Sequence, residues 1–372
     1  MLASTLGIRL ILLVGPTVPL PAPYDVTQAL QSAEVTNDAA TGDGFQLTFT
    51  LGKEGADYTL LSSGLLDTFN RIIVGVLMGA TPEVLIDGII THHQVTPSNE
   101  PGRSTLTITG KDVSVMLDLE EKNEQFPNQT DQIIVTQILG QYAMYGLVPA
   151  PAPTTDVPIE IERVPRQHET DLQFVKRLAQ KNGFVFYVEP VTFGVNNAYW
   201  GPESRASLPQ PALTTNMGHY SNVKSLNFAN DAYAPVGTQG SFVEPTTKTS
   251  IPIPPLPSLK VPPLASSPAT PRRTQLMRQT ANQNASSAAV SAIAAATNAP
   301  DPVTGTGELD AVRYGYVLRA RKLVGVRGAG LNYNGLYYVQ RVSHRISQGT
   351  YTQSFTLRRE GTGTLTPVVR PS

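Results

Sequence analysis

The stretch RQHETDLQFVKRLAQKNGFVFYVE, residues 166–189, contains a helix start, a helix, a stop and a strand in succession. Thr170 and Gln173 match the capping box that satisfies free backbone amides in the first turn of a helix. Apolar residues then recur on one helical face: Leu172, Val175, Leu178 and Ala179. Gly183 can adopt the left-handed conformation that ends a helix. The stretch therefore predicts a capped amphipathic helix.

The residues after Gly183 predict a strand, because Phe184, Phe186 and Val188 alternate with outward positions. Upstream, Thr130 can cap a second helix over 131–145, with Gly146 as its stop. Together these patterns predict an inserted α/β domain over 119–221.

The region before this insertion reads as β. Residues 45–51 alternate strictly between apolar and polar types, and 84–93 and 104–109 form a second pair of candidate strands. Residues 8–14 are apolar but too short to span a bilayer, so they predict a strand, with a signal peptide as the alternative. We therefore expect a β-barrel or sandwich over residues 1–118.

The region from 222 to 372 is β again, with an insertion at about 246–305. Its strands begin at 223–228 and continue over 314–361. Within the insertion, the proline-rich residues 251–263 favour polyproline II, and the alanine-rich residues 272–298 predict a helix, with a flexible linker as the alternative. The chain is thus expected to be mainly β with an α/β insert.

The two β regions contain a short internal echo. Ile90-Thr-His92 precedes an alternating strand that begins at Ser104, and Val342-Ser-His344 precedes another that begins at Ser354. Each pattern predicts a β-hairpin, and their similarity indicates a duplicated unit.

Composition excludes several functions. Across 372 residues the net charge is −1 and 15% of residues are charged, which favours neither a nucleic-acid-binding face nor an acidic tail. The chain has no cysteine, so disulfides, thiolate metal sites and cysteine nucleophiles are excluded. Glycine (30) and proline (31) are abundant, as in strand-and-loop proteins.

Candidate chemical sites have simpler structural interpretations. His92 and His93 are adjacent and would point to opposite faces of a strand, which disfavours a shared metal. Glu169 and Asp171, beside His168, fit a helix start where negative charge is favoured. We therefore expect no metal, no cofactor and no catalytic residue.

An acidic run offers the one enzymatic alternative. It could supply the carboxylate pair of a glycan or peptidoglycan hydrolase, although a solvated face is the simpler interpretation. Its members are Asp118, Glu120, Glu121 and Glu124. A carbohydrate-binding protein would be expected to expose tryptophans, but Trp200 is the one tryptophan of the chain. Common hydrolase, phosphate-loop and dinucleotide motifs are absent from the sequence.

The last region carries a local excess of arginine and tyrosine, which suits either a solvated sheet face or an interface that pairs with carboxylates. The candidate interface residues are Arg319, Arg321, Arg327, Tyr337, Arg341 and Arg358.

Three blocks of sequence resemble the late control protein D/VgrG family, whose members form the hub under the tube of contractile phage tails and related injection machines. They are 84–112 (VLIDGIITHH…STLTITGKD), 166–189 with its D-x-x-F-x-x-R-L-A-x-x-x-G pattern, and 318–361 (LRARKLVGVRGAG…QSFTLRREG). The resemblance implies two tube-like β-barrel domains with the α/β domain inserted between them, assembled as a homotrimeric ring.

The resemblance also implies a role and partners. The hub would cap the distal end of the inner tail tube and contact the tube protein, a central spike, and baseplate wedge or LysM-like adaptor proteins. No nucleic-acid contact and no membrane span are expected. The sequence ends eleven residues after Gly361, without the OB domain and β-helix repeats of VgrG, so we expect a separate spike protein that residues 362–372 reach toward. Assembly would occur in the bacterial cytoplasm, before incorporation into a virion tail or a released tail-like particle.

Overall fold

The computed structural model describes residues 8–54, 57–100, 102–154, 156, 158, 160, 164–243, 248–277 and 284–365. The first part of the chain, called the amino-terminal half below, is almost entirely β. Its elements are β1 (Ile8–Gly15), β2 (Leu20–Pro21), α2 (Tyr24–Ala29), β3 (Leu30–Asp38), β4 (Gly44–Thr50), β5 (Lys53–Glu54), β6 (Asp57–Tyr58), α3 (Thr59–Ser62), β7 (Arg71–Met78), β8 (Thr81–Thr96) and β9 (Thr105–Asp112).

An α/β region, called the inserted region, follows. Its elements are η1 (Val113–Asp118), β10 (Glu121–Gln125), α4 (Asp131–Gly140), η2 (Ala143–Tyr145), β11 (Leu147–Pro151), β12 (Arg166–Thr170), α5 (Asp171–Asn182), β13 (Val185–Thr192) and β14 (Val195–Gly201). The strands β11, β14 and β13 form one small sheet, and β10 pairs with β12 in another.

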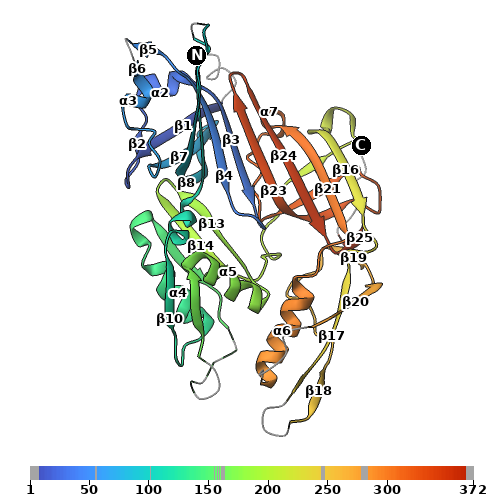
Figure 1. Ribbon diagram of the computed structural model, residues 1–372. Helices are drawn as coiled ribbons and strands as arrows, with labels where there is room; N and C mark the ends of the chain where they lie inside the picture. Colours follow the sequence, from blue (N-terminus) through green and yellow to red (C-terminus); the bar gives the residue numbers. More distant parts are fainter. Residues whose placement is uncertain are drawn as a thin grey trace.

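The carboxy-terminal half returns to β structure. Its elements are β15 (Gln210–Thr214), η3 (Gly218–Tyr220), β16 (Val223–Asn230), β21 (Val303–Asp310), α7 (Ala311–Tyr314), β22 (Leu323–Arg327), β23 (Gly335–Ser347), β24 (Thr350–Arg359) and β25 (Gly361–Thr364). Between β16 and β21 the chain builds an arm that extends away from the sheet (Figure 1). The elements of this excursion are β17 (Val236–Val243), β18 (Ser250–Ile253), β19 (Ala265–Pro268), β20 (Arg273–Leu276) and α6 (Ala285–Thr297).

One sheet runs through both halves. Within the described residues it has thirteen strands, in the order β16-β21-β24-β23-β3-β4-β9-β8-β7-β1-β2, with β22 pairing both β15 and β23. The halves meet where β23 pairs antiparallel with β3 (Figure 1). The predicted mainly β fold with an α/β insert is confirmed, and the joining of the two β regions into one sheet is an addition to it.

Each part has its own apolar core. One cluster lies in the amino-terminal half around Leu47 and Ile108, a second in the inserted region around Phe174 and Trp200, and a third in the carboxy-terminal half around Leu357. A small fourth cluster joins α6 to the arm strands. These cores are compatible with the predicted boundaries near 118 and 221, which stay predictions.

The helix predicted within 166–189 is confirmed as α5. The Gln173 amide donates to Thr170 Oγ1 at 3.3 Å, and Gly183 ends the helix with a φ of 68°. A side chain at Gly183 would also meet Ala294 of α6 at 2.9 Å, so glycine is required twice over. The helix predicted over 131–145 divides into α4 and η2, with Thr130 as the N-cap.

Two predictions for the insertion are wrong in part. The helix predicted over 272–298 begins only at Ala285, and Arg273–Leu276 form β20, which pairs with β17. Polyproline II was not expected to form a ladder, yet Ser250–Ile253 pair with β17 as β18. In both cases pairing with a strand from elsewhere in the arm overrides the local preference. Residues 366–372 of the predicted spike-directed tail lie outside the described residues.

Candidate functional site

The sheet presents a continuous polar face across the junction of the two halves. Side chains of register partners share a face, so each cross-strand row can be followed from strand to strand. One row runs through Thr352, Arg345, Glu34, Gln46 and Thr109. All five side chains are half-buried or exposed, whereas the alternate positions fill the cores.

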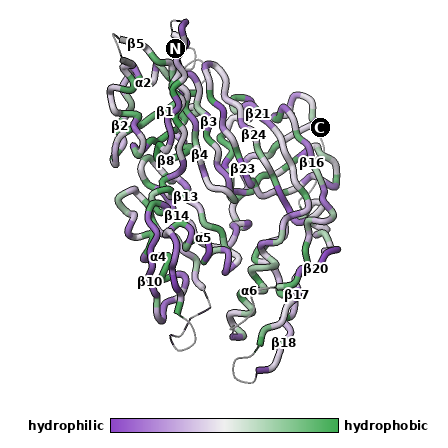
Figure 2. Tube along the Cα trace, viewed as in Figure 1, coloured by the Kyte–Doolittle hydropathy of each residue, from purple (hydrophilic) through white to green (hydrophobic). Residues whose placement is uncertain are grey.

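Two further rows add hydroxyl groups to this face. Thr306 lies opposite Thr356, and Thr36 lies opposite Ser343 at the junction, where their hydroxyls are 2.9 Å apart. Beside them Arg345 pairs with Glu34 at 3.3 Å. Figure 2 shows this alternation of hydrophilic and hydrophobic residues along the strands. The face is therefore rich in neutral hydroxyls and carries charges of both signs.

Arg321, which precedes β22, contacts all three parts of the molecule. Its guanidinium donates to the Asp43 carboxylate, with Nη1 at 3.1 Å from Oδ2, and to the Asp38 carbonyl oxygen at 2.8 Å. Its Cζ atom lies 4.4 Å from the ring centre of Tyr187 in the inserted region. Burial alone would lower the pKa of Arg321, but the charge and hydrogen bond of Asp43, together with Tyr187 and Tyr338, raise it.

A second buried pair joins the inserted region to the amino-terminal half. Arg71 donates to both oxygens of Asp87, at 2.8 and 2.6 Å, and to the Gly194 carbonyl oxygen at 3.1 Å. Asn196 donates to the same carboxylate at 2.8 Å. Because both charged side chains are almost fully buried, removal of either partner would leave an unpaired charge.

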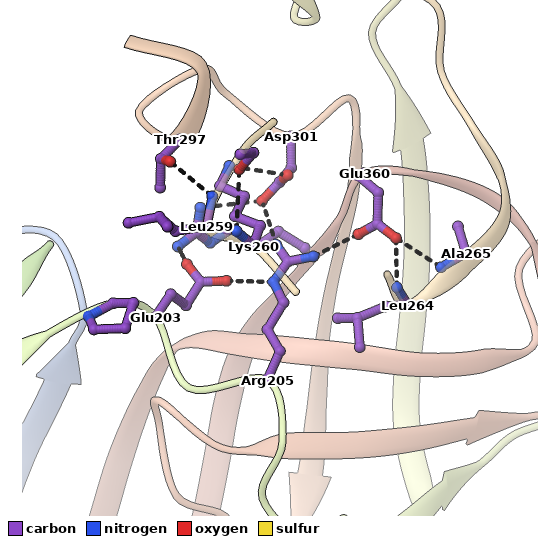
Figure 3. A network of polar contacts seen from close by, with 12 residues as sticks. Glu203, Arg205, Leu259, Lys260, Leu264, Ala265, Thr297, Asp301 and Glu360 are labelled. Atoms are coloured by element: carbon purple, nitrogen blue, oxygen red, sulfur yellow. Dashed lines mark hydrogen bonds and ion pairs between the residues drawn. The ribbon is translucent and has the colours of Figure 1, made fainter. Parts of the chain in front are cut away.

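A larger ion-pair network lies at the base of the arm (Figure 3). Arg205, which is buried, donates to Glu203 at 2.8 Å and Glu360 at 2.6 Å and lies 3.4 Å from Asp301. Glu360 also accepts the backbone amide of Ala265 at 2.8 Å. The network thus ties the segment after β14 to the end of β24 and to the start of β19.

Two further cations complete this network. Arg358 pairs with Asp301 at 3.1 Å and with Glu203, and its guanidinium lies over the ring of Tyr338. Lys260 lies 3.1 Å from Asp301, and burial lowers its pKa despite that carboxylate. Three cations and three carboxylates therefore balance, which makes this network a support for the arm.

The structure places the predicted interface residues in different environments. Arg321 and Tyr337 are buried within the chain, so neither presents its side chain to a partner from the surface. Arg321 neutralises Asp43, and Tyr337 fills the carboxy-terminal core while its hydroxyl donates to the Tyr333 carbonyl oxygen at 2.8 Å.

Arg319 and Arg358 are only 18% and 19% exposed and are engaged within the chain. Arg319 donates to Glu83 and to the Val84 carbonyl oxygen of the amino-terminal half. Arg327 and Arg341 are exposed, and Arg341 lies on the polar sheet face opposite Thr356 and Asp38. An interface role is best proposed for these two.

The acidic run does not converge on one point. Asp118 accepts a hydrogen bond from Thr170 Oγ1 at 2.6 Å at the start of α5. Glu120, Glu121 and Glu124 are exposed, and residues three apart on a strand, such as Glu121 and Glu124, point to opposite faces. A cavity of about 370 Å³ lies away from this run, between β1, α2, β3 and the β23–β24 hairpin.

The remaining sequence candidates are structural. Asp171 accepts hydrogen bonds from Lys122 at 2.6 Å, Tyr142 at 2.8 Å and Gln167 at 2.7 Å. Trp200 is buried, with its indole nitrogen donating to the Val175 carbonyl oxygen at 3.1 Å. In the described residues no group of three or more histidine and acidic side chains is placed to hold a metal ion.

Sequence reasoning missed the buried charges. Asp43 pairs with Arg321, 278 residues away, and Arg205 pairs with Glu360, 155 residues away, so local sequence gives no sign of either contact. A charged residue next to apolar strand residues, such as Asp87 within VLIDGII, is the one sequence signal available.

Comparison with known proteins agrees with this architecture. Residues 73–224 match the family model described as phage tail baseplate hub (GPD). These residues are therefore similar to the hub domain of this family. The matched residues span β8 and β9, the whole inserted region and the return to β16.

Solved structures extend the likeness to the whole chain. A tail protein from Neisseria meningitidis MC58 shares 13% identity with a TM-score of 0.66, covering 95% of this chain and 97% of its own. The 43 kDa tail protein of prophage MuSo2 from Shewanella oneidensis shares 15% identity with a TM-score of 0.61, covering 95% and 98%.

An E. coli type VI secretion system component shares 14% identity with a TM-score of 0.57, covering 92% of this chain and 77% of its own. At these identities the likeness establishes a shared fold. No curated protein sequence matches the chain significantly. Among the described residues, no helix is long and apolar enough to cross a membrane.

Proposed function

We propose that this chain is a structural, non-enzymatic baseplate hub. It would cap the distal end of the inner tail tube and hold a separate central spike in a contractile tail or a phage-tail-like injection system. The family match over residues 73–224 and the fold shared with tail proteins support a hub role.

The pairing of β23 with β3 is the main structural support for a hub. This pairing places two β regions on one sheet, with one polar face running across both. Three copies in a ring would present six such regions, which matches the symmetry of a six-fold tube. The face, rich in hydroxyls and balanced in charge, suits the lumen of that ring because it offers a passing polymer no apolar surface.

The proposed partners follow from this arrangement. The ring would be a homotrimer that contacts the tail tube protein on one side and a spike protein on the other, with baseplate wedge or LysM-like adaptor proteins around it. It would assemble in the bacterial cytoplasm and become part of a virion tail or a released tail-like particle. Obligate contacts of this kind bury about 2,000 Å² or more.

Mass in solution tests the proposal. Sedimentation velocity or native mass spectrometry of the purified chain should give a species of three chains, and negative-stain images should show a ring with a central opening. A chain that stays monomeric at every concentration, including with tube and spike proteins present, would overturn the proposed hub.

A further inference from the structure

The outer strand of the arm has an open edge that is basic and apolar. β20 pairs with β17 on one side, and within the described residues no strand pairs with its other edge. Arg272 and Arg273 are exposed at its start and have no described acidic partner, and Leu276 at its end is 68% exposed. Exposed strand edges of this kind are templates for pairing with another chain.

The arm is held in place. Asn298 at the end of α6 donates to the Gln180 carbonyl oxygen of α5 at 3.2 Å, and α6 packs against Gly183. The ion-pair network of Arg205 fixes the base of the arm. Because α6 occupies the side of the arm that faces the inserted region, β20 lies on the side that faces away from it (Figure 1).

A complementary open edge lies on the inserted region. β10 pairs only with β12 in the described residues. Glu120, Glu121 and Glu124 are exposed there and form no described ion pair, and the preceding Leu119 is 53% exposed. Lys122 does not neutralise them, because its ammonium group turns inward to Asp171 at 2.6 Å.

These two edges lie on opposite sides of the molecule and at the same end of it. Figure 1 shows β10 at the lower left and β20 at the lower right, both below the large sheet. They therefore cannot meet within one chain. A contact between unlike patches on opposite sides is heterologous, and heterologous contacts close into rings when the rotation permits.

We infer that the β20 edge of one copy pairs with the β10 edge of the next copy in the ring. Backbone hydrogen bonds between the edges would supply the attachment, as in strand addition. Arg272 and Arg273 facing Glu121 and Glu124 would set the direction of the contact and oppose pairing of like edges. This inference rests on the proposed trimer and names the surface through which its copies join.

Charge reversal tests the pairing. The variants are Arg272→Glu with Arg273→Glu on the arm and Glu121→Arg with Glu124→Arg on β10. Each double variant brings like charges together and should weaken self-association at least about tenfold in sedimentation equilibrium. The quadruple variant, which carries both pairs of substitutions, should restore the association constant to within about threefold of the unmodified chain. Arg103→Glu, an exposed arginine on the β8–β9 connection, is the control and should change nothing.

Cysteine cross-linking supplies a second measurement, because the chain has no cysteine of its own. Asn123→Cys on β10 and Gln275→Cys on β20 are both exposed positions. Mixed under oxidising conditions, the two single variants should give a covalent dimer, and each variant alone should not. One chain carrying both cysteines should give dimers and trimers on a non-reducing gel.

The outcomes separate this inference from the proposed function. The β10–β20 contact is refuted, while the trimeric hub stands, if the double variants form trimers as tightly as the unmodified chain. It is also refuted if the quadruple variant does not regain self-association. The same holds if covalent dimers form from one single variant alone. An unmodified chain that is always monomeric would refute the hub and, with it, this contact.

Discussion

Each half of the sheet contains a cross-strand pair of a phenylalanine and a glycine that is not evident from its sequence. In the amino-terminal half the ring of Phe45 on β4 lies against Gly110, its partner on β9. In the carboxy-terminal half the ring of Phe355 on β24 lies against Gly307, its partner on β21. Both pairs face the core. Pairs of this kind cover the backbone of a glycine and fix strand register.

The hairpins that look alike in sequence differ at their histidines. Val342, Ser343 and His344 follow one unbroken register on β23, so His344 faces the core and is fully buried. On β8 the register shifts between Ile90 and His92, and this bulge leaves His92 exposed on the polar face. A bulge changes which residues face the core. The similar sequences at 90–92 and 342–344 therefore place their histidines in different environments.

The largest effect is expected from loss of the buried contact that joins the two halves at Arg321. Arg321→Ala would leave Asp43 buried without its guanidinium partner, and loss of one member of a buried pair costs about 3–5 kcal/mol. Urea unfolding should show this loss of stability. Arg345→Ala removes the exposed pair with Glu34 across the same junction and should cost less than about 1 kcal/mol. Equal effects of the two substitutions would contradict a junction held by the buried pair.

Substitution of the glycine in each phenylalanine–glycine pair should cause a smaller loss of stability, and a similar one in both halves. A methyl group on Gly110 would meet the Ile89 carbonyl oxygen at 2.2 Å, and one on Gly307 would meet the Ser225 carbonyl oxygen at 2.4 Å. Gly110→Ala and Gly307→Ala should therefore each destabilise the fold by about 1–3 kcal/mol in urea unfolding.

Gly52→Ala is the matched control, because nothing lies within 4 Å of an added methyl group there. It should be neutral or slightly stabilising. If one of the two core substitutions were as harmless as the control, the halves would not share this pairing.

The smallest effect comes from the buried histidine. Burial, and secondarily the positive charge of Arg319, lowers the pKa of His344 to about 3. The unfolded chain would take up a proton near pH 6.5 and the folded chain only near pH 3, so this residue makes stability fall as pH decreases between those values. Between pH 7.5 and 5.5 its contribution to that fall is about 1 kcal/mol.

His344→Gln should therefore show a decrease in stability from pH 7.5 to 5.5 that is about 1 kcal/mol smaller than in the unmodified chain. Phe355→Leu on the same core face should lower stability equally at both pH values and serves as the control. An unchanged pH dependence in His344→Gln would show that the histidine is not buried in its neutral form.

Local sequence was sufficient where a signal lies within a few residues. The helix 171–182, its threonine cap and glycine stop, and the alternating strand at 45–51 were all predictable, because capping and periodicity act over one or two turns. Local sequence wrongly predicted helix for Arg273–Leu276. These residues pair with β17 instead, and this pairing outweighs the tendency of the following alanine-rich residues to form a helix.

The candidate functional surface was predictable only in its residue types. An excess of arginine was visible in the last region, but the sequence could not tell that Arg321 is buried against Asp43 while Arg341 is exposed. The members of the arm network, such as Arg205 and Glu360, are 155 residues apart, and no periodicity links them.

By itself, then, the sequence determined the mainly β character of the chain, the helix–strand unit at 166–189 and the resemblance to tail hubs, because these depend on local spacing and composition. Tertiary structure decided that β23 pairs with β3 and that a bulge turns His92 outward. It also decided that, among the residues the structure describes, β10 and β20 each keep one unpaired edge. Those features depend on which distant strands meet and in which register, and that choice is made by the burial of whole faces rather than by any single segment.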